Sequence, residues 1–203
     1  MPRLSFWFDY ASTYSHLAAL RIGPAAEAAG VEVTWRPFLL GPIFGAQGWR
    51  DSPFNLYPVK GRNMWRDMDR QAAKHGLPPV RRPEPFPQNS LRAARLTLAL
   101  PEPLRGPFAE SVFRAEFAEG LPIDRVETLA PLLHRLGRDP QADFAAAESP
   151  EIKTALRAVG EEAAALGLYG APSFVAEDGE LFWGHDRLED ALAWATGAHP
   201  RPA

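Results

Sequence analysis

The sequence predicts an α/β domain that is interrupted by a long, all-helical insertion. An apolar run, a helical pattern and an alternating run follow one another over residues 4–36, which is the order of a β-α-β unit. Residues 90–167 show only helical signals. Beyond them, two short apolar runs flank Asp178-Gly179 and precede a last helical pattern, which indicates a β-hairpin and a closing helix.

The composition is that of a globular protein long enough for one sizeable domain. The 203 residues include 46% hydrophobic and 23% charged side chains. A net charge of −3 gives no electrostatic reason to expect nucleic acid or an anionic membrane as a partner. The sequence shows no signal peptide, and no segment approaches the roughly 20 apolar residues of a membrane span, so we expect a cytoplasmic protein.

The residue types present restrict the possible chemistry. The chain contains no cysteine, so any thiol chemistry must use a thiol that a ligand supplies. The sequence contains no phosphate-binding loop and no dinucleotide fingerprint. The histidines have no metal-ligand spacing, and we expect no metal site; they are His16, His75, His134, His185 and His199.

The first predicted strand leads directly into the start of a helix. Leu4–Phe8 is apolar and aromatic, small polar residues follow it, and a helical pattern extends from Ser12 to about Gly30. The alternating run Val31–Arg36 is the second strand. Strands in such a unit are normally parallel, and ligands bind beyond their C-terminal ends, where residues 9–14 lie.

Ser12 stands at the expected N-terminus of the first helix. The first N–H groups of a helix are unpaired, and its dipole places positive charge there, so this position is suited to an anion. The alternative is that Ser12 or Thr13 only caps the helix, because Ser and Thr are usual caps.

Residues 41–58 contain scattered glycines, prolines and aromatic side chains. The segment is too long for an ordinary connection, and its aromatic residues argue against disorder. We interpret it as a lid or wall over the site. A helix from Lys60 to Lys74 follows, and after it comes a proline-dense stretch at residues 78–87.

The helical block between residues 90 and 167 divides into five predicted helices, which are Leu91–Leu100, Phe108–Phe117, Val126–Leu136, Ala142–Ala147 and Glu151–Leu166. Glycine and proline interrupt the pattern at residues 101–107, 120–122 and 137–140. Asp124 and Ser149 are expected to cap the helices that follow them.

The C-terminal part returns to β structure, with expected strands at Ser173–Ala176 and Glu180–Trp183, a last helix at Arg187–Thr196 and a loose tail from His199. The whole order is typical of a thioredoxin-like domain, here residues 1–40 and 167–203. Residues 41–166 are then the lid segment and an inserted all-helical domain.

Two C-terminal positions could contact a ligand. Pro172 in Gly170-Ala-Pro-Ser173 is either an ordinary strand-edge proline or a cis residue. In the cis case, the backbone of Ala171 would face outward and could pair with an extended peptide. Asp186, near the start of the last helix, either caps that helix or receives a ligand ammonium group.

An ordered set of motifs resembles one protein family. Phe8-Asp-Tyr-Ala-Ser-Thr-Tyr-Ser-His-Leu17 is similar to the opening of 2-hydroxychromene-2-carboxylate isomerases and kappa-class glutathione transferases. The motifs that follow in the family's order are Lys60-Gly61 with Trp65, Phe86-Pro-Gln-Asn-Ser90, Gly170-Ala-Pro-Ser173 and Trp183-Gly-His-Asp-Arg-Leu188. The resemblance spans nearly the whole chain and implies a DsbA-like (kappa-type) thioredoxin fold with a helical insertion.

The resemblance also implies a glutathione site. Ser12 matches the position of the reactive cysteine in disulfide oxidoreductases, and it would hold the sulfur of glutathione. A hydroxyl donor at a helix N-terminus would favour the thiolate and lower the thiol pKa. Ala171, before a cis Pro172, would pair through its backbone with the cysteinyl part, and His185 and Asp186 would lie at the γ-glutamyl end.

Further roles follow from the same resemblance. Lys60 would lie near the glycine carboxylate of glutathione or near the substrate acid, while Asn55 and Asn89 would lie in the substrate region. The chain departs from the family at Thr13, which replaces a common proline and leaves open which hydroxyl contacts the sulfur. Arg50 replaces a small polar residue.

The leading hypothesis is a glutathione-dependent isomerase of aromatic oxo-acids. In it, the thiolate adds to an unsaturated carbon, a bond rotates, and elimination releases the isomer. The same thiolate could instead conjugate its substrate, as in a kappa-class transferase. A different hypothesis is a non-catalytic thioredoxin-like module that holds extended peptides at Pro172. Relatives in the family imply a homodimer.

Overall fold

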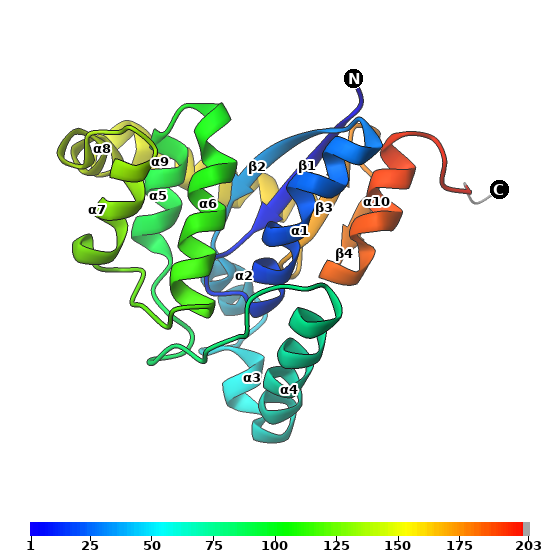
Figure 1. Ribbon diagram of the computed structural model, residues 1–203, viewed down its shortest axis with the longest axis horizontal. Coiled ribbons are helices and arrows are strands. Elements are labelled where there is room, and N and C mark those ends of the chain that lie inside the picture. Colours follow the sequence, from blue (N-terminus) through cyan, green and yellow to red (C-terminus); the bar gives the residue numbers. More distant parts are fainter. Residues whose placement is uncertain (201–203) are drawn as a thin grey trace.

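The computed structural model describes residues 1–200 and contains a mixed sheet of four strands (Figure 1). The strands are β1 (Arg3–Phe8), β2 (Glu32–Pro37), β3 (Ser173–Ala176) and β4 (Leu181–Trp183). Their order is β2-β1-β3-β4, with β1 and β2 parallel and the other two pairs antiparallel. The β-α-β unit and the hairpin predicted from the sequence are both confirmed.

Helices cover both faces of the sheet. Successive side chains of β1 point to opposite faces, and apolar side chains of this strand are buried on both. Phe6 and Phe8 belong to the largest buried cluster, together with side chains from α1 (Thr13–Ala29) and α10 (Leu188–Ala195). Trp7 points to the other face, where it packs in a second cluster with Val159 and Ala163. The continuous apolar run of the first strand therefore reflects burial on both of its faces.

The remaining helices belong to the segment between β2 and β3, and they are α2 (Leu40–Ala46), α3 (Pro53–Leu56), α4 (Pro58–Lys74), α5 (Leu91–Ala99), α6 (Glu102–Phe117), α7 (Val126–Arg135), α8 (Pro140–Ala147) and α9 (Pro150–Ala165). A 3₁₀ turn (His185–Arg187) precedes α10. In Figure 1, α5–α9 lie to the left of the sheet, and α3 and α4 lie below it.

Three local expectations are corrected. Residues 41–58 contain two short helices, and α3 begins because Pro53 occupies its first turn and Ser52 caps it. Helix α6 begins six residues earlier than expected. Prolines at its cap and in its first turn are tolerated, because the N–H that proline lacks would have no intrahelical partner there. Asp124 does not cap α7, whose N-cap is Arg125, whereas Ser149 caps α9 as predicted.

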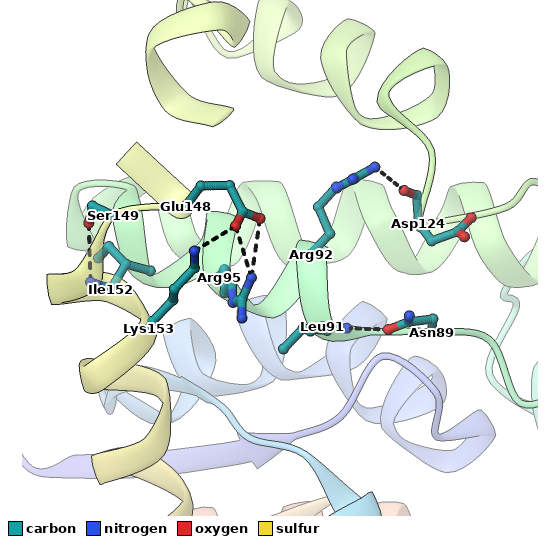
Figure 2. Close-up of polar contacts among 9 residues, drawn as sticks. All are labelled: Asn89, Leu91, Arg92, Arg95, Asp124, Glu148, Ser149, Ile152 and Lys153. Atoms are coloured by element: carbon teal, nitrogen blue, oxygen red, sulfur yellow. Dashed lines mark hydrogen bonds and ion pairs between the residues drawn. The ribbon is translucent and has the colours of Figure 1, made fainter. Parts of the chain in front are cut away.

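The helical block is tied together by charged side chains, as Figure 2 shows. The carboxylate of Glu148, at the end of α8, accepts hydrogen bonds from Arg95 of α5 at 3.1 and 3.2 Å. Lys153 of α9 lies 3.0 Å from the same carboxylate. Arg92 donates to the backbone carbonyl of Asp124 instead of to a side chain. These contacts fix α8 and α9 against α5.

The largest buried cluster extends from the sheet into the helical block without a break. It contains Phe6 of β1, Phe113 of α6 and Leu129 of α7, each completely buried. The core therefore does not separate the two predicted domains, and their division stays a prediction about independent folding units.

The C-terminal segment is packed further than expected. The ring of His199 lies 5.5 Å from that of Trp194, so the loose tail does not begin there, and residues 201–203 of that tail lie outside the described part. Within residues 1–200, none of the helices is both long and apolar enough to cross a membrane.

Candidate functional site

A cavity of about 750 Å³ lies between the N-terminus of α1, the segment before β3 and the chain from α2 to α4. Much of its wall is aromatic, contributed by Phe44, Trp49, Phe54, Phe86, Tyr169 and Trp183. The predicted lid segment, residues 41–58, supplies the first three of these side chains. The cavity lies beyond the C-terminal ends of the two parallel strands, where the β-α-β unit predicted a ligand site.

Ser12 makes two hydrogen bonds at the cavity wall. Its hydroxyl oxygen accepts from the backbone N–H of Ser15 at 3.1 Å, so Ser12 caps α1. The hydroxyl also donates to the backbone carbonyl of Ala171, at 2.9 Å, because a carbonyl can only accept. A ligand that took this hydrogen bond would have to replace the Ala171 carbonyl as the acceptor.

Thr13 differs from Ser12 in its environment. Thr13 also lines the cavity, but only 1% of its surface is exposed. The hydroxyl of Thr13 has no hydrogen-bond partner within residues 1–200. Ser12 is 8% exposed. The two hydroxyls are therefore distinguishable: that of Ser12 is engaged at the wall, and that of Thr13 is buried and unpaired.

The segment before β3 brings its backbone to the same wall. Ala171 lines the cavity, and the bond between Ala171 and Pro172 is cis. Pro172 itself is buried and does not line the cavity. The N–H of Ala171 makes no hydrogen bond in the described part of the chain, so it is available to a ligand.

Asp9 supports the site from the end of β1, and sequence reasoning gave it no role. Its two carboxylate oxygens accept from the backbone N–H groups of Leu40 at 2.7 Å and Ala11 at 3.0 Å. Burial raises the pKa of Asp9, while the hydrogen bonds from Leu40, Ser90 and Ala11 oppose that rise. Asp9 thus joins the start of α2 to the start of α1. A carboxylate directly after an apolar strand was the signal available in the sequence.

Two ionisable groups lie buried beneath the site. Burial, assisted by the nearby charge of Arg114, lowers the pKa of His16 to about 3, so its ring is neutral at pH 7. Burial and the nearby Asp9 raise the pKa of Glu116 well above its ordinary value. Neither carboxyl oxygen of Glu116 has a hydrogen-bond partner among residues 1–200. Neither residue lines the cavity.

Lys60 and Arg50 place two positive charges on the cavity wall. Lys60 lies in the first turn of α4, which has no side-chain cap, and its ammonium lies 5.8 Å from the ring centroid of Tyr57. Arg50 lies in the exposed connection between α2 and α3. The wall is therefore largely apolar but carries charge that favours an anion.

The two asparagines are used differently. Asn89 lines the cavity, and its amide oxygen accepts from the backbone N–H of Leu91 at the start of α5 (Figure 2). Asn55 does not line the cavity, because its amide nitrogen donates to Asp51 and, at 2.9 Å, to the carbonyl of Phe86. Asn55 therefore links the lid to the proline-dense stretch.

His185 and Asp186 lie behind the cavity wall rather than on it. The His185 ring stacks on that of Tyr14 at 5.3 Å, and burial lowers its pKa. Tyr14 lines the cavity, and no role was predicted for it. Asp186 is exposed and lies 3.5 Å from Arg187, which is itself the N-cap residue of α10, so Asp186 makes no cap.

Comparison with known proteins identifies the class. Residues 3–193 match the model of the DSBA-like thioredoxin domain, and the chain belongs to that family. The chain is also similar to the 2-hydroxychromene-2-carboxylate isomerase of Sphingobium xenophagum, with 28% identity over 92% of this chain and 94% of the relative.

Solved structures agree with that placement. A 2-hydroxychromene-2-carboxylate isomerase superposes with a TM-score of 0.86 and 26% identity, over 96% of this chain and 94% of that structure. A probable DsbA oxidoreductase from Streptomyces coelicolor superposes with a TM-score of 0.75 and 22% identity, over 100% of this chain and 93% of that one. The predicted thioredoxin-like, DsbA-type fold is thereby confirmed.

Proposed function

We propose that this protein is a glutathione-dependent isomerase of aromatic oxo-acids of the 2-hydroxychromene-2-carboxylate type. The observation that carries the proposal is Ser12, which caps α1 at the wall of a large aromatic cavity in a chain without cysteine. The similarity to 2-hydroxychromene-2-carboxylate isomerase over 92% of the chain supports it.

The residues present suit glutathione. The free N–H of Ala171 can pair with the backbone of an extended tripeptide. The cavity volume of about 750 Å³ lies in the upper half of the range for small-molecule sites, roughly 300–1,000 Å³, and leaves room for a second ligand. Tyr14 of the cavity wall stacks on His185, and Asp186 follows His185 in the chain. The ammonium of the γ-glutamyl end would reach past Tyr14 to the Asp186 carboxylate.

Bound glutathione would supply a thiolate that adds reversibly to an unsaturated carbon of the oxo-acid, so that a bond can rotate before the thiolate leaves. The chain supplies the surroundings. Ser12 would turn its hydroxyl from the Ala171 carbonyl to the sulfur, and the N-terminus of α1 would stabilise negative charge there. The aromatic wall would exclude water, and Lys60 would attract a carboxylate.

The test is turnover of 2-hydroxychromene-2-carboxylate with and without glutathione, together with calorimetric binding of glutathione to the wild type and to Ser12→Ala. We expect isomerisation only when glutathione is present. Activity that is independent of glutathione, or a wild type that does not bind it, would refute the proposal. A stable glutathione conjugate in place of the isomer would indicate a transferase.

A further inference from the structure

Two positive charges in the cavity wall lack a counter-charge. Arg50 and Lys60 both line the cavity, and neither forms an ion pair within residues 1–200. A cation that lines a cavity without a counter-charge is suited to bind an anionic ligand, because a hydrogen bond between charged groups is stronger than one between neutral groups.

The carboxylates of the same wall are already satisfied by neutral donors. Asp9 accepts from two backbone N–H groups. Asp51, next to Arg50 in the chain, accepts from the N–H of Ser52 at 2.6 Å and from the amide of Asn55 at 3.1 and 3.2 Å. Neither carboxylate neutralises the two cations, which leaves both available.

The two cations lie on different segments of the chain. Lys60 belongs to α4, and α4 is joined to the Ser12 side of the site because Tyr14 donates to Asp67 at 3.1 Å. Tyr14 also stacks on His185. Lys60 therefore belongs to the wall that continues toward the glutathione side.

Arg50 belongs to the segment that connects α2 to α3. It follows Trp49, whose ring packs against Phe44 of α2 at 5.5 Å. Asp9 holds the start of α2 through the N–H of Leu40. Arg50 is therefore carried by the lid segment, whereas Lys60 is carried by α4.

We propose that Arg50 anchors the carboxylate of the oxo-acid substrate, while Lys60 takes the glycine carboxylate of glutathione. This inference rests on the proposed function, which brings two carboxylates into one cavity that holds two unpaired cations. A guanidinium can bind a planar carboxylate through two parallel hydrogen bonds, so Arg50 would also orient the substrate, which an ammonium does less well.

The test uses an unreactive pair of ligands on the full chain. Binding of trans-cinnamate, an unsaturated aromatic acid, and of its neutral amide, trans-cinnamamide, is measured calorimetrically for the wild type and Arg50→Gln. We expect Arg50→Gln to weaken cinnamate about tenfold or more, since a hydrogen bond to a charged group is lost. Binding of cinnamamide and of glutathione should not change. Arg50→Lys should retain part of the preference for the acid.

Two matched variants complete the test. Lys60→Gln should weaken glutathione but not its glycine ethyl ester, which lacks that carboxylate. Arg62→Gln removes an exposed charge of α4 that does not line the cavity, and it should change none of these affinities.

Specific results would overturn the inference. Arg50 is not the anchor if Arg50→Gln leaves cinnamate binding unchanged or weakens the amide by the same factor. The same conclusion follows if Lys60→Gln, instead of Arg50→Gln, abolishes the preference for the acid. Failure of the wild type to bind glutathione would refute the proposed function separately, because the cinnamate pair is measured without glutathione.

Discussion

At the scale of the residue, Ser12 combines two roles that compete for one side chain. Its oxygen caps α1 through the N–H of Ser15, and its hydrogen is directed to the carbonyl of Ala171. The cap uses a lone pair, so it can persist when the hydrogen turns to a ligand. The capping and ligand-binding interpretations of this serine are therefore compatible.

Ser12→Ala should lower the free energy of unfolding by about 1 kcal/mol, the usual effect of removing an N-cap. It should also raise the pKa of the bound glutathione thiol, because a hydrogen-bond donor to the thiolate is lost. Denaturant unfolding measures the first effect, and a pH titration of the thiolate ultraviolet absorbance measures the second.

Thr13→Val provides the control for this prediction. It removes a buried hydroxyl that has no partner within residues 1–200, so stability should stay constant or rise. The thiol pKa should not move. A rise in the thiol pKa with Thr13→Val and not with Ser12→Ala would identify Thr13 as the group that contacts the sulfur.

Glu116 should make stability depend on pH. Burial raises its pKa in the folded state above the ordinary value of 4.5, so the folded protein holds the proton more tightly than the unfolded chain. Its contribution is fully present below that value and is lost as the pH rises toward the folded pKa, by about 1.4 kcal/mol per pH unit. Glu116→Gln should remove this part of the slope in urea unfolding measured from pH 4.5 upward.

Asp9, whose pKa is also raised, would keep a slope of the same sign in that variant. Glu119→Gln, at an exposed position of the same region, is the control and should leave the slope as it is. Stability curves of the wild type and Glu116→Gln that run parallel from acid to neutral pH would contradict the prediction.

At the scale of the element, the α3–α4 pair forms one wall of the cavity through close backbone packing. A Cβ atom built on Gly61 of α4 would lie 2.2 Å from the backbone carbonyl oxygen of Phe54 in α3. Phe54 lines the cavity. Only glycine, which has no Cβ atom, lets α3 and α4 approach so closely.

Gly61→Ala should therefore separate α3 from α4 and lower stability by about 1–3 kcal/mol, the usual effect of overpacking. Because Phe54 would move with α3, substrate affinity should fall as well. Thermal or urea unfolding, with calorimetric binding of cinnamate, measures both effects.

Gly160→Ala, within α9, is the matched control. No neighbour lies within 4 Å of a Cβ built there, so alanine should stabilise the helix by up to about 1 kcal/mol. The prediction for Gly61 would be wrong if both substitutions were stabilising.

At the scale of the whole molecule, the sheet and the helical block share one buried cluster, which includes Phe8 of β1 and Leu129 of α7. The ion pair of Arg95 with Glu148 is partly exposed and joins helices within the block, so it adds little to the connection between the block and the sheet. Apolar burial should therefore couple the two parts during unfolding.

Leu129→Ala should lower the free energy of unfolding of the whole chain by about 2–5 kcal/mol, because Leu129 is completely buried. The transition should stay single when it is followed by tryptophan fluorescence and by far-ultraviolet circular dichroism. The six tryptophans all lie outside α5–α9, so fluorescence follows the rest of the chain, whereas circular dichroism also follows the helical block. Two separated transitions would show that the helical block unfolds independently.

The sequence by itself determined the strands, most helices and the hairpin, because each depends on neighbouring residues: apolar periodicity, Ser12 and Ser149 as caps, and Asp178-Gly179 as a turn. It also identified the DsbA-like fold, through motifs that occur in a fixed order. The start of α6 was misplaced, since prolines at the cap and in the first turn resemble a helix break. The N-cap of α7 was placed one residue early, at Asp124 instead of Arg125.

Only the tertiary structure decided what surrounds the cavity. Ser12 contacts a carbonyl 159 residues away, and Asp9 binds a backbone N–H that is 31 residues away, contacts that no local pattern specifies. The same is true of Asn55, whose amide donates to the carbonyl of Phe86, 31 residues away, instead of facing the cavity. A side chain's partner depends on which distant segments the core brings together, and packing rather than local propensity makes that choice.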